Sequence, residues 1–317
     1  MHVALNTGDY PGKILLFGEY SVIENSDALV FPYRAVSAEL IFPEDFAVDG
    51  VVSESNRVLV ALAEHIHRMQ DESDSNLGID AASFRRDANK GMILKSTIPL
   101  RYGLGSSGAL CAAVYDRYAY MKPPRNSNVT QELYRKTRNI LASMESFFHG
   151  RSSGIDPLCS YFNRGLHIQG DGTILGLNPE APPHACTAFL IDTGMPRETG
   201  KLVALFGTML KDPDIAGIFR NQYVPLVNEV IHAFNEDGPC YEWIQKLSLF
   251  QYRFFEPMIP VKFRAVWLYG IESGYYALKL CGSGGGGMIL GFTKDLSAAH
   301  RLIREYSGLS VIPFSWF

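Results

Sequence analysis

A glycine-rich loop that runs directly into an apolar helical pattern most constrains how this chain can fold. The segment PLRYGLGSSGALCAAVYDRY spans residues 99–118, and its glycines permit a tight turn that Cβ atoms would obstruct. The apolar spacing that follows predicts a helix over about 109–120. Because a helix start offers unpaired N–H groups and a partial positive charge, phosphate is its natural ligand. The residues predicted to line this site are Gly103, Leu104, Gly105, Ser106, Ser107 and Gly108.

The same loop also satisfies G-x-G-x-x-G, the pattern of a dinucleotide site. That pattern opens a βαβ unit and is followed about 20 residues later by a carboxylate at a strand end. Here Pro99 interrupts the approach and MKPPRNSN follows near residues 120–128, which disfavours a nicotinamide site. A plain loop whose glycines only permit a turn remains open. The chain contains no G-x-x-x-x-G-K-[ST], which excludes a P-loop nucleotide hydrolase.

A second glycine run, KLCGSGGGGMILGF, spans residues 279–292. It also satisfies G-x-G-x-x-G, but MILGF is typical of a strand, so the helix that would hold a pyrophosphate is missing. Four consecutive glycines cost backbone entropy, which indicates that some group approaches this backbone closely. A flexible hairpin is the alternative.

The third segment, ESFFHGRSSGIDPL at residues 145–158, contains the G-x-S-x-G pattern of an esterase nucleophile elbow. Such an elbow joins a strand to a helix. Here a predicted helix precedes the pattern, and we expect Pro157 to oppose a helix directly after it, so a serine hydrolase is disfavoured. Glu145 at a helix end and Asp156 in the following loop could supply a metal ligand and a base. Two ordinary surface carboxylates are the alternative.

Strand-like and helical patterns are mixed along the chain without a strict βαβ rhythm, which predicts an α+β fold in two lobes. We expect an N-terminal domain over 1–180 and a C-terminal domain over 181–317, with the boundary in PEAPPH at 179–184. Helices are predicted over 57–70, 109–120, 130–148, 200–211, 217–235, 240–253 and 295–306. Strands are predicted over 14–17, 36–42, 91–98, 184–192, 275–280 and 288–292.

Composition excludes several classes of partner. The formal net charge of −4 leaves no excess of Lys and Arg for a phosphate backbone, so nucleic acid is not expected. The 5 cysteines are odd in number and none lies at metal-ligand spacing, which favours free thiols in a reducing cytosol. The N-terminus lacks a signal pattern, and no stretch approaches the roughly 20 apolar residues of a membrane span, so we expect a cytoplasmic protein.

Three segments in order along the chain resemble the motifs of the GHMP kinase superfamily. They are PGKILLFGEY at 11–20, PLRYGLGSSGA at 99–109 and GSGGGGM at 282–288. The family motifs are P-G-K-x-x-x-x-G-E, P-x-x-x-G-L-G-S-S and G-x-G-G-G-G. The resemblance implies a two-lobed fold with the active site in the cleft between the lobes. It also implies an ATP-dependent kinase with an alcohol acceptor.

Within the superfamily, HGRSSGID at 149–156 is similar to the H-G-x-P-S-G-I-D segment of mevalonate kinases, and DTGMPRETGKLV at 192–203 is similar to their P-R-x-T segment. This implies phosphorylation of the primary hydroxyl of mevalonate to 5-phosphomevalonate, a step of isoprenoid biosynthesis. Three residues depart from the pattern. Tyr20 stands where mevalonate kinases usually have His and phosphomevalonate kinases often have Tyr, Ser152 replaces Pro, and Gly108 stands where Ala is common. Phosphomevalonate kinase, or another GHMP kinase, is therefore the alternative.

The resemblance also implies a role for each matching residue. Asp156 would act as the base and Lys13 as its cationic partner, while Ser107 and Glu145 would ligate Mg²⁺. ATP would be held by residues 103–108 and by Gly284 and Gly285. The acceptor would be bound by Glu19, Tyr20, His149, Arg197 and Thr199. A non-catalytic binding protein of the same fold is the remaining alternative, and the sequence leaves the oligomeric state open, a homodimer included.

Overall fold

The computed structural model describes residues 8–42, 50–72, 78–125, 129–177, 186–236 and 238–314, and these divide into two compact units. The first unit comprises the chain up to Lys13, Pro32–Pro99 and Leu104–Gly165, and the second comprises Ile14–Phe31, Leu100–Gly103 and the chain from Leu166 onward. The domain boundary expected at 179–184 lies outside the described residues, so the domain limits stay a prediction.

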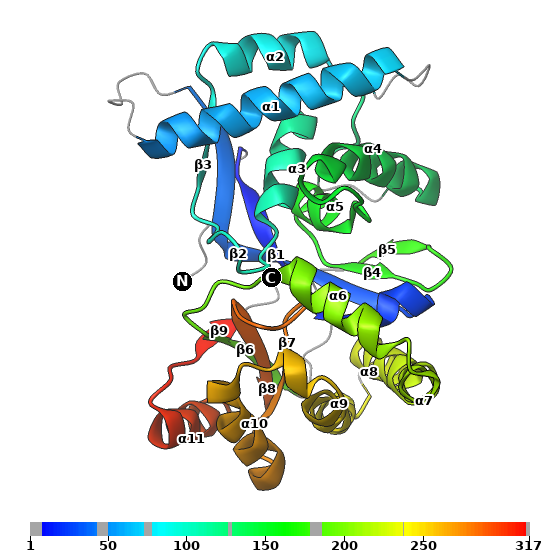
Figure 1. The fold of residues 1–317 in the computed structure, drawn as a ribbon, viewed down its shortest axis with the longest axis vertical. Coiled ribbons are helices and arrows are strands. Elements are labelled where there is room, and N and C mark those ends of the chain that lie inside the picture. The colour runs from blue at the N-terminus through cyan, green and yellow to red at the C-terminus, as the bar shows by residue number, and fades with distance from the viewer. Residues whose placement is uncertain are drawn as a thin grey trace. The chain divides into compact units, whose positions relative to one another are not determined.

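The first unit is mainly helical (Figure 1). Its helices are α1 (Gly50–Glu72), α2 (Ala81–Asn89), α3 (Ser106–Tyr118), α4 (Gln131–His149) and α5 (Ile155–Phe162). Helix α1 contacts α2, while α3, α4 and α5 pack against one another. Strand β3 (Ile93–Ser96) pairs antiparallel with the second half of β2 (Ala28–Ile41). The side chains of Leu59, Leu62 and Ile66 on α1 are fully buried and recur at the spacing of an amphipathic helix.

The second unit contains a four-stranded antiparallel sheet in the order β7-β8-β6-β9. These strands are β6 (Thr187–Asp192), β7 (Ala277–Leu280), β8 (Met288–Thr293) and β9 (Ile312–Phe314). Its α-helices are α6 (Thr199–Met209), α7 (Pro213–Ile218), α8 (Val224–Asn235), α9 (Cys240–Phe254), α10 (Val261–Ser273) and α11 (Leu296–Ser307). Helices α9 and α10 contact β7. Figure 1 draws both helices beneath the strands of this sheet.

A second sheet contains β1 (Tyr10–Phe17), β2, β4 (Leu166–Ile168) and β5 (Ile174–Gly176) in that order, with β3 paired to β2. Strands β1 and β2 each contribute residues to both units. Short helical turns are η1 (Ser21–Glu24), η2 (Phe219–Tyr223) and η3 (Glu256–Met258). No helix of the described ranges is both long enough and apolar enough to cross a membrane.

Local signals fix several helix ends. The Asp295 side chain accepts a hydrogen bond from Ala298 N at 2.9 Å and caps α11, and Gly308 ends that helix at φ 70°. The Thr130 hydroxyl likewise caps α4 by accepting from Leu133 N. The predicted α+β class is confirmed, and helices or strands occur in each of the predicted regions that the structure describes.

The prediction that Pro157 opposes a helix after the RSSG segment is wrong, because α5 begins at Ile155. Pro157 lies in the first turn, where the helix does not use the N–H group that proline lacks. The first backbone bond of α5 runs from Leu158 N to Gly154 O. The nucleophile elbow still does not fit, since helix α4 and not a strand precedes the segment. Helices α2 and α10 and strands β4, β5 and β9 were not predicted from the sequence, because they are short or lack an obvious period.

Candidate active site

The start of α3 has the form that the sequence predicted for a phosphate site. Gly105 adopts the left-handed conformation at φ 76°, and the first backbone bond of the helix runs from Ala109 N to Gly105 O at 2.9 Å. The helix ladder therefore does not use the N–H groups of Ser106, Ser107 and Gly108. Phosphate binding by this turn stays a prediction.

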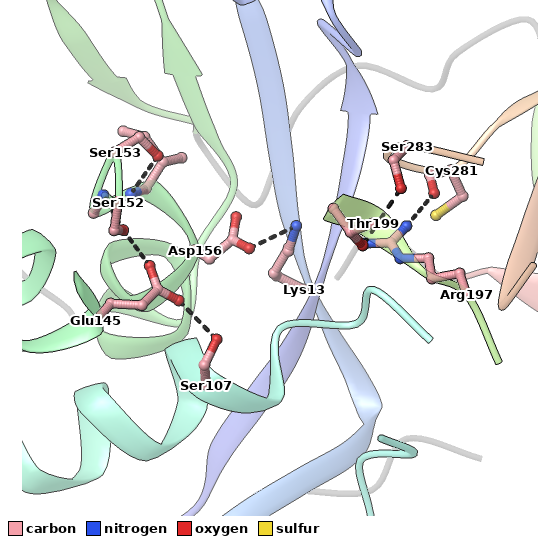
Figure 2. Close-up of polar contacts among 12 residues, drawn as sticks. Lys13, Ser107, Glu145, Ser152, Ser153, Asp156, Arg197, Thr199, Cys281 and Ser283 are labelled. Carbon is pink, nitrogen blue, oxygen red and sulfur yellow. Dashed lines mark hydrogen bonds and ion pairs between the residues drawn. The ribbon is translucent and has the colours of Figure 1, made fainter. Parts of the chain in front are cut away.

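Lys13 and Asp156 form an ion pair beside this turn (Figure 2). The Lys13 ammonium, on β1, lies 2.8 Å from a carboxylate oxygen of Asp156 in the first turn of α5. The Lys13 side chain is 9% exposed and that of Asp156 is 35% exposed, so the carboxylate is the more accessible member. Lys13 N also donates to Leu104 O at 2.8 Å, which joins β1 to the loop before α3.

Two glycines allow this pair to approach α3. A Cβ on Gly105 would lie 2.6 Å from Lys13 Cγ, and a Cβ on Gly108 would lie 2.9 Å from the backbone carbon of Asp156. Real Cβ atoms essentially never come this close to another heavy atom. Gly108, a departure from the family's usual Ala, is therefore needed here for the position of Asp156.

Glu145, at the end of α4, is the second carboxylate of the site and is only 3% exposed. The Ser107 hydroxyl donates to Glu145 Oε1 at 2.9 Å, and the Ser152 hydroxyl donates to Oε2. Burial raises the pKa of Glu145 to about 7, and the negative charge of Asp156 adds to the rise. The two serine hydroxyls and the Lys13 ammonium oppose this rise in pKa without cancelling it.

Ser107 and Glu145 fit the predicted magnesium site. Their hydroxyl and carboxylate oxygens meet at one point, and hard oxygen ligands are those that Mg²⁺ prefers. Within the described ranges, no group of three or more His, Cys, Asp or Glu side chains could hold a metal. A magnesium ion here would therefore take its other ligands from water and phosphate, as Mg²⁺ commonly does.

The glycine run after β7 packs against the backbone of its own unit. A Cβ on Gly284 would lie 2.7 Å from Met258 O, and one on Gly286 would lie 2.6 Å from Met195 O. The amide of Gly285 donates to Met258 O, and that of Gly287 donates to Met195 O, each at 2.7 Å. The group that the sequence predicted to lie close to the glycine backbone is thus the backbone of Met258 and Met195. The ATP-binding roles of Gly284 and Gly285 stay predictions.

Arg197 lies against two glycines of the second unit. Its guanidinium occupies the space that a Cβ on Gly103 or on Gly282 would need, and it donates to Cys281 O at 2.8 Å (Figure 2). The backbone amide of Arg197 donates to Arg101 O at 2.9 Å.

The other predicted acceptor-binding residues differ in their surroundings. Glu19 is 2% exposed and pairs with the fully buried Lys279, which opposes the rise that burial causes in the pKa of Glu19. The Tyr20 hydroxyl donates to Ser283 O at 2.8 Å, and the Ser283 hydroxyl lies 3.5 Å from that of Thr199. His149 ends α4, and its side chain lies outside what the structure describes.

Two polar residues of these clusters were not assigned a role from the sequence. Ser152 was recognised only as a departure from Pro, and its hydroxyl accepts from Gly154 N at 2.9 Å as it donates to Glu145. Lys279 carries the only signal that could have revealed the buried pair, a single charge within the apolar run YYALKL. A buried lysine in such a run requires a partner, but the sequence does not indicate which one.

Two family models match the chain. Residues 59–164 match the family model described as GHMP kinases N terminal domain, and residues 264–308 match that described as GHMP kinases C terminal. No curated protein sequence matches the chain.

Solved structures show the same fold over nearly the whole chain. L. major mevalonate kinase in complex with R-mevalonate has a TM-score of 0.62 at 15% identity, covering 99% of this chain and 98% of that one. Lactococcus lactis galactokinase complexed with galactose gives 0.64 at 13% identity, with 98% and 93% covered. Streptococcus pneumoniae phosphomevalonate kinase in complex with phosphomevalonate and AMPPNP gives 0.61 at 15% identity, with 97% and 98% covered. These identities show a shared fold and do not select an acceptor.

The raised pKa of Glu145 predicts a pH-dependent stability. Between its ordinary pKa of 4.5 and about 7, the folded protein holds a proton that the unfolded chain releases. The free energy of unfolding should therefore fall as pH rises through this window, by at most about 1.4 kcal/mol per pH unit. Glu145→Gln cannot titrate, so its stability relative to wild type should improve by about 1–2 kcal/mol between pH 5 and pH 7 in urea unfolding.

Glu54→Gln provides the control, because Glu54 on α1 has a side chain that is 71% exposed. Its unfolding curves should follow those of wild type at each pH. A constant difference between Glu145→Gln and wild type across this range would contradict the burial argument.

Proposed function

We propose that this chain, which belongs to the GHMP kinase superfamily, is an ATP-dependent kinase that phosphorylates the primary hydroxyl of mevalonate to give 5-phosphomevalonate. The observation that carries this proposal is the HGRSSGID segment, which resembles that of mevalonate kinases and holds Asp156 against Lys13 and Ser152 against Glu145. The acceptor is the part of the proposal that rests on resemblance. The proposed base and metal site depend on the charged side chains of Lys13, Glu145 and Asp156.

Asp156 is the proposed general base. Phosphoryl transfer requires positioning, neutralisation of charge and at most one base for the acceptor hydroxyl. The Asp156 side chain is 35% exposed and can receive a substrate proton, whereas Glu145 is 3% exposed and has both oxygens hydrogen-bonded. Lys13 would compensate negative charge as the hydroxyl loses its proton.

Ser107 and Glu145 would hold the magnesium ion in this proposal. When bound, Mg²⁺ supplies positive charge to the phosphate oxygens. Both residues supply hard oxygen atoms, and Ser152 holds the second oxygen of Glu145 in place. The first turn of α3 would bind phosphate through its N–H groups.

Arg197 is proposed to bind the carboxylate of the acceptor. A guanidinium carries five donors in a planar fork that matches a carboxylate. Among the described residues, Arg197 makes one side-chain hydrogen bond, to Cys281 O, so it keeps donors for a ligand. His149 and Thr199 are proposed as further acceptor contacts because of the resemblance alone.

Phosphomevalonate is the second candidate acceptor, and Tyr20 is the observation that favours it, since phosphomevalonate kinases often carry Tyr at this position. An ATP-consumption assay with mevalonate, phosphomevalonate, galactose and homoserine tests the choice. We expect the highest kcat/KM with mevalonate. A higher value with phosphomevalonate would replace the proposed acceptor. No turnover with any of the four would refute the proposed acceptor and leave a kinase of another substrate or a non-catalytic binding protein.

Asp156→Asn should lower kcat by about 10²- to 10⁴-fold, because a positioned base is lost while the side-chain shape is kept. Affinity for a non-hydrolysable ATP analogue should change by less than about threefold, since the base acts on the acceptor. Steady-state kinetics and calorimetric titration measure the two effects. Asp71→Asn, at a side chain 66% exposed on α1, should leave both unchanged. Wild-type turnover by Asp156→Asn would remove Asp156 from the mechanism.

Lys13→Met should be similarly damaging. The variant keeps the length of the aliphatic chain but leaves Asp156 and the buried Glu145 without the ammonium that faces them. We expect a loss in kcat on the order of 10²-fold or more when it is assayed beside wild type at saturating ATP. An unaltered rate would show that Lys13 serves structure only.

A further inference from the structure

Three side chains hold the backbone where β7 passes into the glycine run. The Lys279 ammonium donates to Leu280 O, Arg197 Nη1 donates to Cys281 O at 2.8 Å, and the Tyr20 hydroxyl donates to Ser283 O at 2.8 Å. We call Gly282–Gly287, the glycine run that resembles the third family motif, the third glycine loop. Arg197 and Tyr20 come from two other segments of the second unit, and of the three side chains only Tyr20 bonds to a residue within the loop, Ser283.

Tyr20 is held firmly enough to act as such an anchor. Its ring lies 4.5 Å from that of Phe206 and stacks on that of Phe255 at 5.1 Å. Its backbone is at φ 62°, a conformation that costs a non-glycine residue free energy and persists only where the surroundings impose it. Burial raises the pKa of the Tyr20 hydroxyl, so the hydroxyl stays protonated and can donate.

A buried network connects Glu19, the residue before Tyr20, to the strand before the loop. Tyr223 donates from its hydroxyl to Glu19 O at 3.2 Å, and Gln251 donates to the Tyr223 hydroxyl at 2.8 Å. The other end of the Gln251 amide accepts from Leu280 N at 2.8 Å. The Glu19–Lys279 pair makes a second connection to the same strand. The GEY end of the first motif and the start of the third glycine loop are thus one hydrogen-bonded assembly.

We propose that Tyr20 is a positioning residue whose hydroxyl holds the third glycine loop in the shape that binds nucleotide. The inference rests on the proposed function for the loop's ligand and departs from the expectation that Tyr20 contacts the acceptor. The amides of Gly285 and Gly287 already bond to Met258 O and Met195 O, so the start of the loop, at Ser283, is the part that the Tyr20 hydroxyl orders. Without that bond, a ligand would have to supply the cost of ordering the start of the loop. An anchor at Ser283 reduces that cost before the nucleotide arrives.

Tyr20→Phe tests the proposal, because it removes the hydroxyl and keeps the ring between Phe206 and Phe255. Without nucleotide, amide hydrogen exchange of the peptide containing Gly282–Gly287 should be about three- to tenfold faster, which is the usual effect of losing one neutral hydrogen bond. The Kd of a non-hydrolysable ATP analogue and KM for ATP should rise by about the same factor. KM for the acceptor should stay within about twofold of wild type.

Tyr241→Phe is the matched control. The Tyr241 hydroxyl also donates to a backbone carbonyl of the second unit, Gly274 O at 3.1 Å, from a partly buried position. Its loss should lower thermal stability about as much as Tyr20→Phe does, without faster exchange in the third glycine loop or weaker nucleotide binding. Equal effects of both variants on the loop would overturn the positioning role.

Two other results would also overturn the proposal. One is a raised acceptor KM in Tyr20→Phe with unchanged loop exchange and ATP affinity, which would make Tyr20 an acceptor contact. The other is no change in any of these quantities. A wild-type protein that binds no ATP analogue would instead refute the proposed function and the nucleotide role of the loop. Faster exchange in Tyr20→Phe would then still show that the hydroxyl anchors the loop.

Discussion

The ion pair between Lys13 and Asp156 is the interaction on which the rest of the first unit's polar cluster depends. It joins β1 to the first turn of α5 at 2.8 Å, and α3 begins beside it only because Gly105 and Gly108 carry no Cβ atoms. A side chain at either glycine would displace Lys13 or the backbone of Asp156. The glycine motif therefore has two uses in one segment. It permits the turn that starts α3, and it makes room for the charged pair beside that turn.

The charges around this pair do not balance. Two carboxylates, Asp156 and the buried Glu145, face one ammonium, and the pKa of Glu145 is raised as a result of burial and of its negative neighbour. Folding thus places a carboxylate where its ionised form is disfavoured, and two serine hydroxyls recover only part of the cost. A divalent cation would supply the missing positive charge. Below about pH 7 a proton on Glu145 restores the balance, and in the proposed function the magnesium ion would take the place of that proton.

The features that could be predicted from the sequence are those with local causes. Helix α11 follows from its apolar period, the Asp295 cap and the terminal Gly308, and α3 follows from the period after its glycine loop. Helix α5 was missed because a proline was treated as a breaker, although in a first turn it costs no hydrogen bond. The buried partner of Glu19 could not be predicted, because the pairing of Lys279 with Glu19 depends on tertiary packing. For the candidate site, the sequence singled out Lys13, Ser107, Glu145 and Asp156, which the structure brings together, but it did not indicate which hydroxyl faces which carboxylate.

The contacts of Tyr20 in the structure weaken it as evidence for either acceptor. At the sequence level, this residue was the main reason to consider phosphomevalonate, since it departs from the His that mevalonate kinases usually carry. Its hydroxyl already donates to Ser283 O and its ring is packed between two phenylalanines, so a tyrosine here has a structural cause within the second unit. Because the Tyr20 hydroxyl already donates its hydrogen to Ser283 O, its presence is poor evidence for a contact with a particular acceptor. Arg197, with a single side-chain hydrogen bond among the described residues, has donors to spare for the carboxylate of an acceptor. Mevalonate and phosphomevalonate both carry that carboxylate, so selection between them requires a further cation that faces the additional phosphate.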